Sequence, residues 1–397
     1  MDGARTRGQA VALRAVAAMI RGPVPHAVLL VGPDGVGKTT LAVDLAAGLL
    51  CTAEPPERPC RGCRACRLVD GGGHPDLHRL GPVGPGRQVV IGGPDAKFRG
   101  VRDLVAELAL MPAEGGARVA IVEGADRMNE DAQSALLKTL EEPPPGVTII
   151  LCADGEDHLL PTVRSRCFRV RLGLVGPRDI EAIVADHGLV DPPTAARLGR
   201  LAGGRPGLAL AYARAPEAVL IRAELTRSLL DLTDARPSAR LAAARVVIPR
   251  AMALVAALAS GDPAAAVRPA RRRGAATPVP VDPPAEPGEE DPGAIDEPAA
   301  ARSVPASDRR RAVELLLALW IDVTRDLVLV GSGGSRSVHD TVLLDELGAI
   351  SASIGPGDAT AFLERSAQAV ELLAGNVSPE LVLDSLVLAW PRRAAAA

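Results

Sequence analysis

The stretch Gly32-Pro33-Asp34-Gly35-Val36-Gly37-Lys38-Thr39 fits the pattern Gly-x-x-x-x-Gly-Lys-Thr of a phosphate-binding loop. The apolar run 27–31 before it predicts a β-strand, and Leu41, Leu45 and Leu49 after it predict one face of a helix. Strand, loop and helix follow one another in the order that the motif requires. A chance glycine-rich turn would rarely place Lys-Thr at this offset. The sequence therefore predicts a nucleotide site in an α/β domain.

Each residue type in this loop suits a phosphate chain. Glycines let backbone N–H groups turn toward phosphates, a lysine reaches the terminal phosphates, and a hydroxyl holds Mg²⁺. We expect ATP or ADP with Mg²⁺ to bind here. The candidate residues are Gly32, Gly35, Gly37, Lys38, Thr39 and Thr40.

Length and composition limit the class of protein. The chain has 397 residues, 47% of them hydrophobic, which is enough for roughly two to three packed domains. Its net charge is −3 and 2% of its residues are aromatic, so neither a phosphate-tracking surface nor a base-stacking platform is indicated. No uninterrupted apolar run approaches the roughly 20 residues of a membrane span, and no signal-peptide core follows residues 1–5. We expect a folded, cytoplasmic protein with no membrane partner.

Four cysteines follow the loop and its helix in the arrangement Cys-x8-Cys-x2-Cys-x2-Cys. In a reducing compartment, four clustered thiols suit one tetrahedral Zn²⁺, and the prolines and glycine between them suit a turn-rich knuckle. Disulfides are the alternative for a secreted chain, and free buried thiols the alternative for a cytosolic one. Four sulfur ligands leave no open position, so we expect a structural role. The ligands would be Cys51, Cys60, Cys63 and Cys66, in a module at 51–66.

Strand and helix patterns alternate through the rest of this domain. Strands are predicted at 76–80, 88–91, 118–123, 147–152 and 168–172, and helices at 5–22, 40–50, 101–108 and after Asn129. His74 could be a fifth metal ligand, but we expect a cap or turn residue. Glu123 ends a buried strand, where an acid can hold Mg²⁺ through water. Gly124 cannot supply the neighbouring carboxylate that polarises water. Asp126, two residues further on, could be recruited for this role, but we expect it to cap the next segment.

The remainder of the chain is predicted to be helical apart from one stretch. Between 262 and 307 the composition shifts to prolines and charges, including Arg271-Arg272-Arg273, which predicts a disordered insertion. This arginine run could touch DNA, although a solvated charge run is the simpler interpretation. The expected domains are a nucleotide-binding α/β domain with a parallel sheet at 1–174, a small helical domain at 175–214, and an all-α domain at 215–397 interrupted by the insertion.

Three features together are similar to the bacterial clamp-loader AAA+ subunits of DNA polymerase III. They are the phosphate loop, the four-cysteine insert after its helix, and Ser165-Arg166-Cys167. The pattern extends to about residue 210, and within the family His74-Pro75-Asp76 and Glu141-Glu142-Pro143 resemble the delta-prime branch most. The resemblance implies an AAA+ domain at 1–174, a helical lid at 175–214 and an oligomerising helical collar at 215–397.

The resemblance also implies partners and a mechanism. The partners would be the gamma/tau and delta subunits in a hetero-pentameric ring, the sliding clamp, and primed DNA reached through the complex. Arg166 would be an arginine finger offered to ATP on an adjacent subunit. A surface arginine in an ion pair is the alternative. The chain would then help load the clamp as a subunit of the DNA-directed DNA polymerase III holoenzyme.

Two departures from the motor subunits of such loaders weaken the case for hydrolysis. Motor subunits carry an adjacent Asp-Glu pair where this chain has Glu123-Gly124. They also place an arginine in the small helical domain, where Arg205 is about two positions out of step. We expect bound nucleotide with weak or absent ATPase activity. The alternatives are a gamma/tau-type motor ATPase of the same loader, and an unrelated P-loop enzyme such as a small-molecule kinase, which would have no use for the knuckle or for Ser165-Arg166-Cys167.

Overall fold

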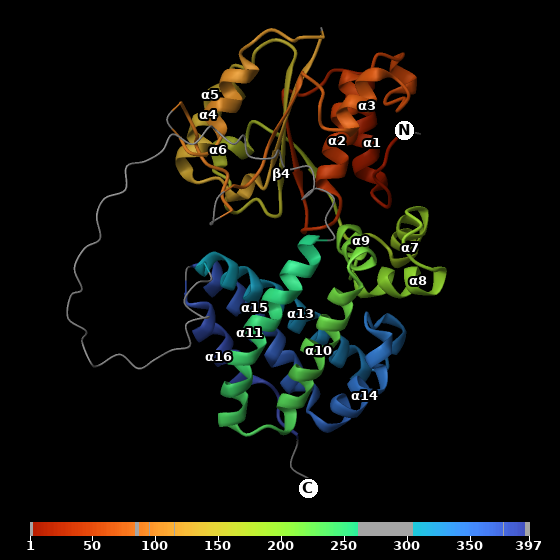
Figure 1. The fold of residues 1–397 in the computed structure, drawn as a ribbon, viewed down its shortest axis with the longest axis vertical. Helices are drawn as coiled ribbons and strands as arrows, with labels where there is room; N and C mark the ends of the chain where they lie inside the picture. The colour runs from red at the N-terminus through yellow and green to blue at the C-terminus, as the bar shows by residue number, and fades with distance from the viewer. Residues whose placement is uncertain are drawn as a thin grey trace, which may run out of the picture.

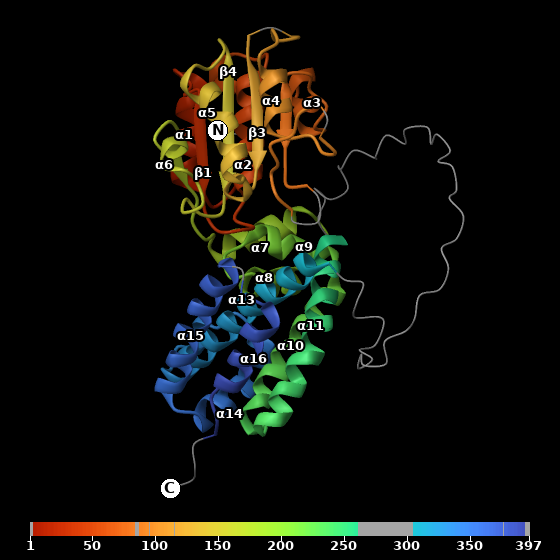
Figure 2. The same cartoon turned by 90° about the vertical axis from the view of Figure 1, so that its left-hand side faces the viewer.

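The computed structural model describes residues 3–83, 87–94, 96–114, 116–260, 305–375 and 377–393. Figure 1 shows an α/β domain at the top, a group of short helices in the middle and a bundle of longer helices below. Figure 2 shows the same three parts following one another along the long axis of the molecule. The phosphate loop lies in the α/β domain, and the last described helix belongs to the bundle.

Five parallel strands form the central sheet in the order β2-β3-β4-β1-β5. They are β1 (Ala27–Val31), β2 (Leu77–Leu80), β3 (Arg118–Glu123), β4 (Val147–Ala153) and β5 (Phe168–Arg171). The predicted parallel α/β sheet is confirmed. The strand predicted at 88–91 is not part of this sheet, although Gln88 and Val89 form isolated β-bridges to Val83 and Met128. The carbonyls of Val90 and Ile91 instead accept hydrogen bonds from the first residues of a helix, Val101 and Arg102.

Helices cover both faces of the sheet. Val28 and Leu30 of β1 belong to the apolar core on one face, and Ala27 and Leu29 to the core on the other. A parallel sheet buried on both faces gives such continuous apolar strands. In Figure 1 α1 to α3 lie on one side of the sheet and α4 to α6 on the other. These helices are α1 (Ala10–Arg21), α2 (Lys38–Leu50), α3 (Arg64–Asp70), α4 (Val101–Leu108), α5 (Glu130–Glu141) and α6 (Pro161–Arg164).

The remaining described helices share one apolar core that runs from Val175 to Trp390. At its centre, the ring of Phe362 lies 4.8 Å from that of Trp390 and 6.4 Å from that of Trp320, measured between centroids. The three middle helices are α7 (Pro177–Asp186), α8 (Pro192–Leu201) and α9 (Pro206–Arg214). The bundle contains α10 (Pro216–Leu230), α11 (Pro237–Ser260), α13 (Ala306–Gly331), α14 (Leu344–Ser353), α15 (Pro356–Ala374) and α16 (Pro379–Ala389).

The helix α11 is, within the described ranges, the one helix that could cross a membrane by length and composition alone, with a mean hydropathy of 1.8. Arg240, Arg245 and Arg250 interrupt its apolar sequence. It packs against α10, α13 and α16, and the buried Arg240 guanidinium donates to the Trp390 carbonyl at 2.6 Å. These contacts make α11 a helix of the bundle that buries one face against its neighbours.

The predicted insertion at 262–307 lies outside the described residues except at its end. Residues 305–307 are described, and α13 begins there at Ala306. The helical pattern that resumes in this part of the sequence therefore starts two residues earlier than the predicted Asp308.

Candidate nucleotide and metal sites

The predicted phosphate loop joins β1 to α2 at the carboxyl edge of the sheet. Gly35 and Gly37 have left-handed backbones, with φ of 77° and 102°, which glycine adopts without the steric cost of a side chain. A Cβ on Gly32 would lie 2.3 Å from the carbonyl oxygen of Leu172, so only glycine fits there. Thr39 and Thr40 lie in the first turn of α2. One strand, loop and helix thus bring together Gly32, Gly35, Gly37, Lys38, Thr39 and Thr40.

The Lys38 ammonium is buried within this loop. Its side chain is 8% exposed and donates to the carbonyls of Gly32 at 2.7 Å and Pro33 at 2.8 Å. The third bond, at 2.6 Å, goes to Oδ1 of Asp154, the residue that follows β4. An ammonium has three donors, so these bonds occupy all of them.

The predicted metal-holding acid, Glu123, is engaged in an ion pair. Its Oε1 accepts from Arg79 Nη2 at 2.5 Å and from Nε at 3.1 Å. Burial, and then the charge of Glu123, raise the pKa of the Cys152 thiol to about 12, while Lys38 acts in the opposite direction. Both charges therefore lie near Cys152, and Glu123 belongs to the same edge of the sheet as Lys38.

The prediction that Asp126 caps the next segment is wrong. Its Oδ1 accepts from the backbone N–H of Asp154 at 3.2 Å, so it supports the loop that follows β4. Asn129 caps α5 as predicted, since its side chain accepts from Ala132 at 3.0 Å. Burial raises the pKa of the Asp126 carboxyl, and the charge of Asp154 adds to the effect.

The middle helices touch the phosphate loop directly. The backbone N–H of Gly207, in the first turn of α9, donates to the Gly35 carbonyl at 2.9 Å. Arg205, just before α9, is directed elsewhere, since its Nη2 pairs with Oδ2 of Asp322 in α13 at 3.1 Å. Arg205, which lies about two positions from where the motor subunits place their arginine, therefore makes an ion pair with the helical bundle.

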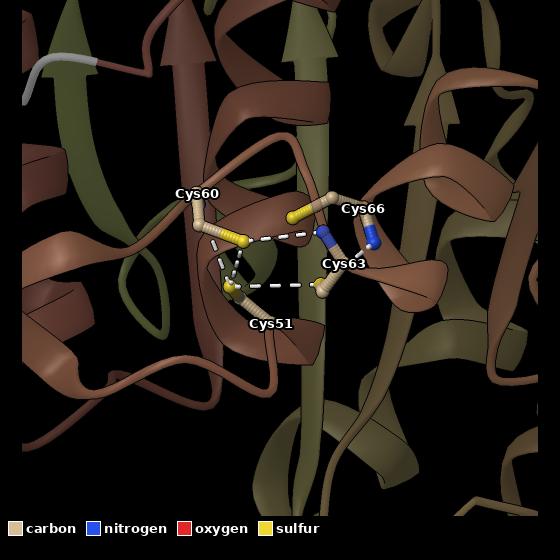
Figure 3. A group of neighbouring side chains, drawn as sticks. All are labelled: Cys51, Cys60, Cys63 and Cys66. Atoms are coloured by element: carbon tan, nitrogen blue, oxygen red, sulfur yellow. Dashed lines mark hydrogen bonds between the residues drawn. The ribbon is translucent and has the colours of Figure 1, made fainter.

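The four cysteines of the predicted knuckle gather at the carboxyl end of α2. Their sulfur atoms all lie within 4.8 Å of one another, and Figure 3 shows the side chains converging. The Sγ of Cys51 lies 3.5 Å from that of Cys60 and 3.9 Å from that of Cys63. This cluster could hold a metal ion. His74 is a turn residue as predicted, because its Nδ1 accepts from the backbone N–H of Asp76 at 3.1 Å.

Backbone donors lower the pKa of Cys60 and Cys63, whereas burial raises the pKa of Cys51 and Cys66. The N–H of Cys63 points at Cys60 Sγ and that of Cys66 at Cys63 Sγ, each at 3.4 Å. Burial tends to raise the pKa of Cys63, but N–H donors from Cys66 and Thr52 outweigh it and lower that pKa to about 5. Thiolate is the form that binds metal. Because the donors come from the knuckle itself, its fold favours the metal-binding form at this position.

The knuckle is joined to α2 by Arg61. Its guanidinium makes an ion pair with Asp44, a fully buried residue of α2, and another with Asp70 of α3 at 2.5 Å. Asp44 also accepts from the backbone N–H of Arg5 at 3.0 Å and of Thr6 at 2.9 Å. The N-terminal segment, the knuckle and α2 therefore meet at one buried carboxylate.

The predicted finger, Arg166, follows α6 and is partly exposed. Its Nη2 pairs with Oε1 of Glu141 at 2.7 Å, and its Nη1 donates to the Thr162 carbonyl at 3.0 Å. The ion pair that was the alternative for Arg166 is therefore present. Its side chain is 34% exposed and that of Glu141 is 49% exposed, so solvent reaches both groups.

Sequence reasoning missed the partners of the predicted site residues. Asp154 is separated from Lys38 by 116 positions, and Arg79 from Glu123 by 44. One signal was available for Asp154: it is an acid that directly follows a buried strand, the same pattern that singled out Glu123.

The α/β domain defined by this sheet and loop is of the P-loop class. Residues 9–175 match the model of a family described as "DNA polymerase III, delta subunit". The chain is 39% identical over 142 residues to the DNA polymerase III subunit delta' of Haemophilus influenzae, a match that covers 36% of this chain and 41% of the relative. It is 37% identical over 183 residues to the delta' subunit of Pseudomonas aeruginosa, covering 46% of this chain and 53% of the relative.

These matches confirm the resemblance to the delta-prime branch of the clamp-loader family. The chain spans about half the length of the curated delta' relatives it matches. It is also 32% identical over 181 residues to the DNA polymerase III subunit tau of Salmonella typhimurium, which covers 45% of this chain and 27% of the relative.

Proposed function

We propose that this chain is a delta-prime-type subunit of a bacterial DNA polymerase III clamp loader and helps to load a sliding clamp onto primed DNA. The family match over residues 9–175 carries this proposal, because that region contains the phosphate loop, the cysteine cluster and Arg166. The partners would be gamma/tau and delta subunits in a hetero-pentameric ring, the clamp, and primed DNA through the complex. Such a subunit works in the cytoplasm, with α7 to α9 as the lid and the bundle as the collar.

The phosphate loop fits ATP or ADP with Mg²⁺. Its glycines have the backbone conformations that turn N–H groups toward a phosphate, and α2 presents its N-terminus there. Lys38 would hold the terminal phosphates, and Thr39 and Thr40 offer hydroxyls for the cation. Glu123 would join the cation through water with its Oε2, because both bonds from Arg79 go to Oε1.

The hydrolysis machinery on this chain is incomplete. Gly124 stands where a second carboxylate would polarise water, and Arg205 bonds to Asp322. We therefore propose that the chain binds nucleotide and hydrolyses it weakly or not at all.

The cysteine cluster fits a structural Zn²⁺. With Zn–S bonds of about 2.3 Å, tetrahedral geometry separates the sulfur atoms by about 3.8 Å. The sulfur distances of 3.5 and 3.9 Å lie on either side of this value. Cys51, Cys60, Cys63 and Cys66 would fill four positions, leaving none for a substrate.

Arg166 is proposed to act on a neighbouring subunit. A guanidinium is always charged and planar, so it can neutralise charge that develops on a transferring phosphoryl group. To reach a neighbour it must leave Glu141, and its partial exposure supports such an exchange.

Reconstitution tests the proposed function. The purified chain, mixed with gamma/tau and delta subunits, should enter one complex on size-exclusion chromatography with light scattering. That complex should load clamps onto primed DNA faster than the same mixture lacking this chain. A chain that stays separate from gamma/tau and delta, and leaves clamp loading unchanged, would contradict the proposal.

The tau relative favours one alternative, a gamma/tau-type motor subunit. ATP turnover by the isolated chain separates the two. A delta-prime-type subunit should stay near background, whereas robust turnover that disappears in Lys38→Ala would favour the motor.

A further inference from the structure

Asp154 stands opposite the start of the phosphate loop. The strand β4 pairs with β1 up to Ala153 and Val31, and the N–H of Gly32 donates to the Ala153 carbonyl at 3.3 Å. The next residue on β4's side is Asp154. The sheet register therefore places the Asp154 carboxylate next to the Lys38 ammonium.

The bonds of Lys38 differ in how easily they can be exchanged. The carbonyls of Gly32 and Pro33 belong to the loop backbone, and the bonds that Lys38 donates to them maintain the conformation of the loop. Asp154 is the one side chain among these three acceptors. It is 39% exposed, so water can solvate its carboxylate when the bond to Lys38 breaks. A phosphate that reaches the Lys38 ammonium would most readily replace the Asp154 carboxylate.

The surrounding charges also oppose a phosphate. Asp126 lies against Asp154, and the charge of Asp154 contributes to the raised pKa of Asp126. Glu123, by contrast, is paired with Arg79. A nucleotide at Lys38 would therefore approach two carboxylates, and like charges at short range disfavour binding.

We propose that Asp154 competes with the phosphates of a nucleoside di- or triphosphate for Lys38, and that it thereby weakens nucleotide binding. The inference rests on the proposed nucleotide-binding function and deepens it by naming the residue that sets the affinity. Because Mg²⁺ neutralises part of the phosphate charge, binding to the unaltered chain should depend strongly on Mg²⁺.

Titration of the full chain with a fluorescent ADP tests this competition. Asp154→Asn keeps the size of the side chain and removes its charge. It should tighten ADP binding on the order of tenfold, with a larger gain in EDTA than in Mg²⁺. Asp157→Asn removes one charge from an exposed position on the same loop and should change the affinity less than twofold. Circular dichroism and a melting curve check that both variants fold.

Each other outcome has a definite meaning. If the unaltered chain binds ADP, loses it in Lys38→Ala and shows no gain in Asp154→Asn, the competition is refuted while nucleotide binding stands. Weaker binding by Asp154→Asn in Mg²⁺ alone would make Asp154 a group that holds the cation, which also overturns the inference. If neither the unaltered chain nor Asp154→Asn binds ADP at millimolar concentration, both the inference and the proposed nucleotide site fail.

Discussion

The phosphate loop and the cysteine knuckle lie at opposite ends of α2 and differ in where their parts come from. At the carboxyl end, Cys51 follows the helix directly and all four sulfurs come from residues 51–66. At the amino end, the loop is local, but Lys38 bonds to Asp154 and Gly35 accepts from Gly207. The knuckle is thus built from one short segment. The contacts of the phosphate loop, by contrast, involve segments that are distant in the sequence.

This difference suggests how each site responds to change. A site built from one segment should fail locally when a ligand is lost. A site shared between β1, β4 and α9 should respond to substitutions far from the loop. The predictions below test this contrast, beginning with the largest expected effect.

Loss of one knuckle ligand should abolish metal binding. Cys63→Ser should reduce zinc from about one ion per chain to almost none, because apparent binding free energies of structural zinc sites are about 10–16 kcal/mol and depend on every ligand. Elemental analysis measures the metal, and hydrogen exchange should show loosening confined to the knuckle and its neighbours. Cys167→Ser, outside the cluster, should keep its zinc. Metal-free wild-type protein from a chelator-free purification would refute the zinc site.

Removal of the finger should slow the assembled loader without unfolding this chain. Arg166→Ala should leave assembly intact and lower ATP turnover at the neighbouring site by about 10³ to 10⁵. In the proposed ring the bulk rate should fall less, because neighbouring sites would be served by arginines of other subunits. Turnover with clamp and primed DNA is the measurement. Arg169→Ala, an exposed arginine paired with Glu156 at 3.1 Å, is the control and should keep the normal rate. Equal rates in both variants would remove Arg166 from the mechanism.

The support between knuckle and α2 should be worth several kcal/mol. Arg61→Leu leaves the fully buried Asp44 without its guanidinium, although two backbone donors remain. We expect a loss of about 3 kcal/mol in the free energy of unfolding, measured with urea at saturating zinc. Arg64→Leu breaks a pair with Glu114 in which the arginine is 68% exposed, and should cost under about 1 kcal/mol. Similar losses in the two variants would show that the buried pair adds no more stability than the exposed pair.

Restoring the missing acid should have the smallest effect. Gly124→Glu recreates an acidic pair, but Gly124 has a φ of 63° and a Cβ there would lie 3.0 Å from Pro82 Cγ. We expect a cost of about 1–2 kcal/mol in stability and ATP turnover that stays near background. The control Gly188→Glu, at a φ of 61° with open space around it, should cost less. Substantial hydrolysis by Gly124→Glu would show that one carboxylate was all the site lacked.

Local features were predictable from the sequence, and pairings across the fold were not. The phosphate loop and the cysteine cluster are defined by spacing within one segment, so the pattern alone located them. The strand predicted at 88–91 is reduced to isolated bridges, because an apolar run does not reveal that Val90 and Ile91 accept hydrogen bonds from the start of α4. Likewise, Glu123 was identified as an acid at a strand end, but its engagement by Arg79 follows from the pairing of β2 with β3.

The contact between Arg205 and Asp322 couples the start of α9 to α13. The helix begins at Ala306, and Asp322 lies about 24 Å along it at 1.5 Å per residue. If α9 shifts with the phosphate loop, the pair transmits that shift to α13 at this point. A tilt of about 5° would then move the start of α13 by about 2 Å, a displacement comparable to the helix shifts that accompany switching at subunit interfaces.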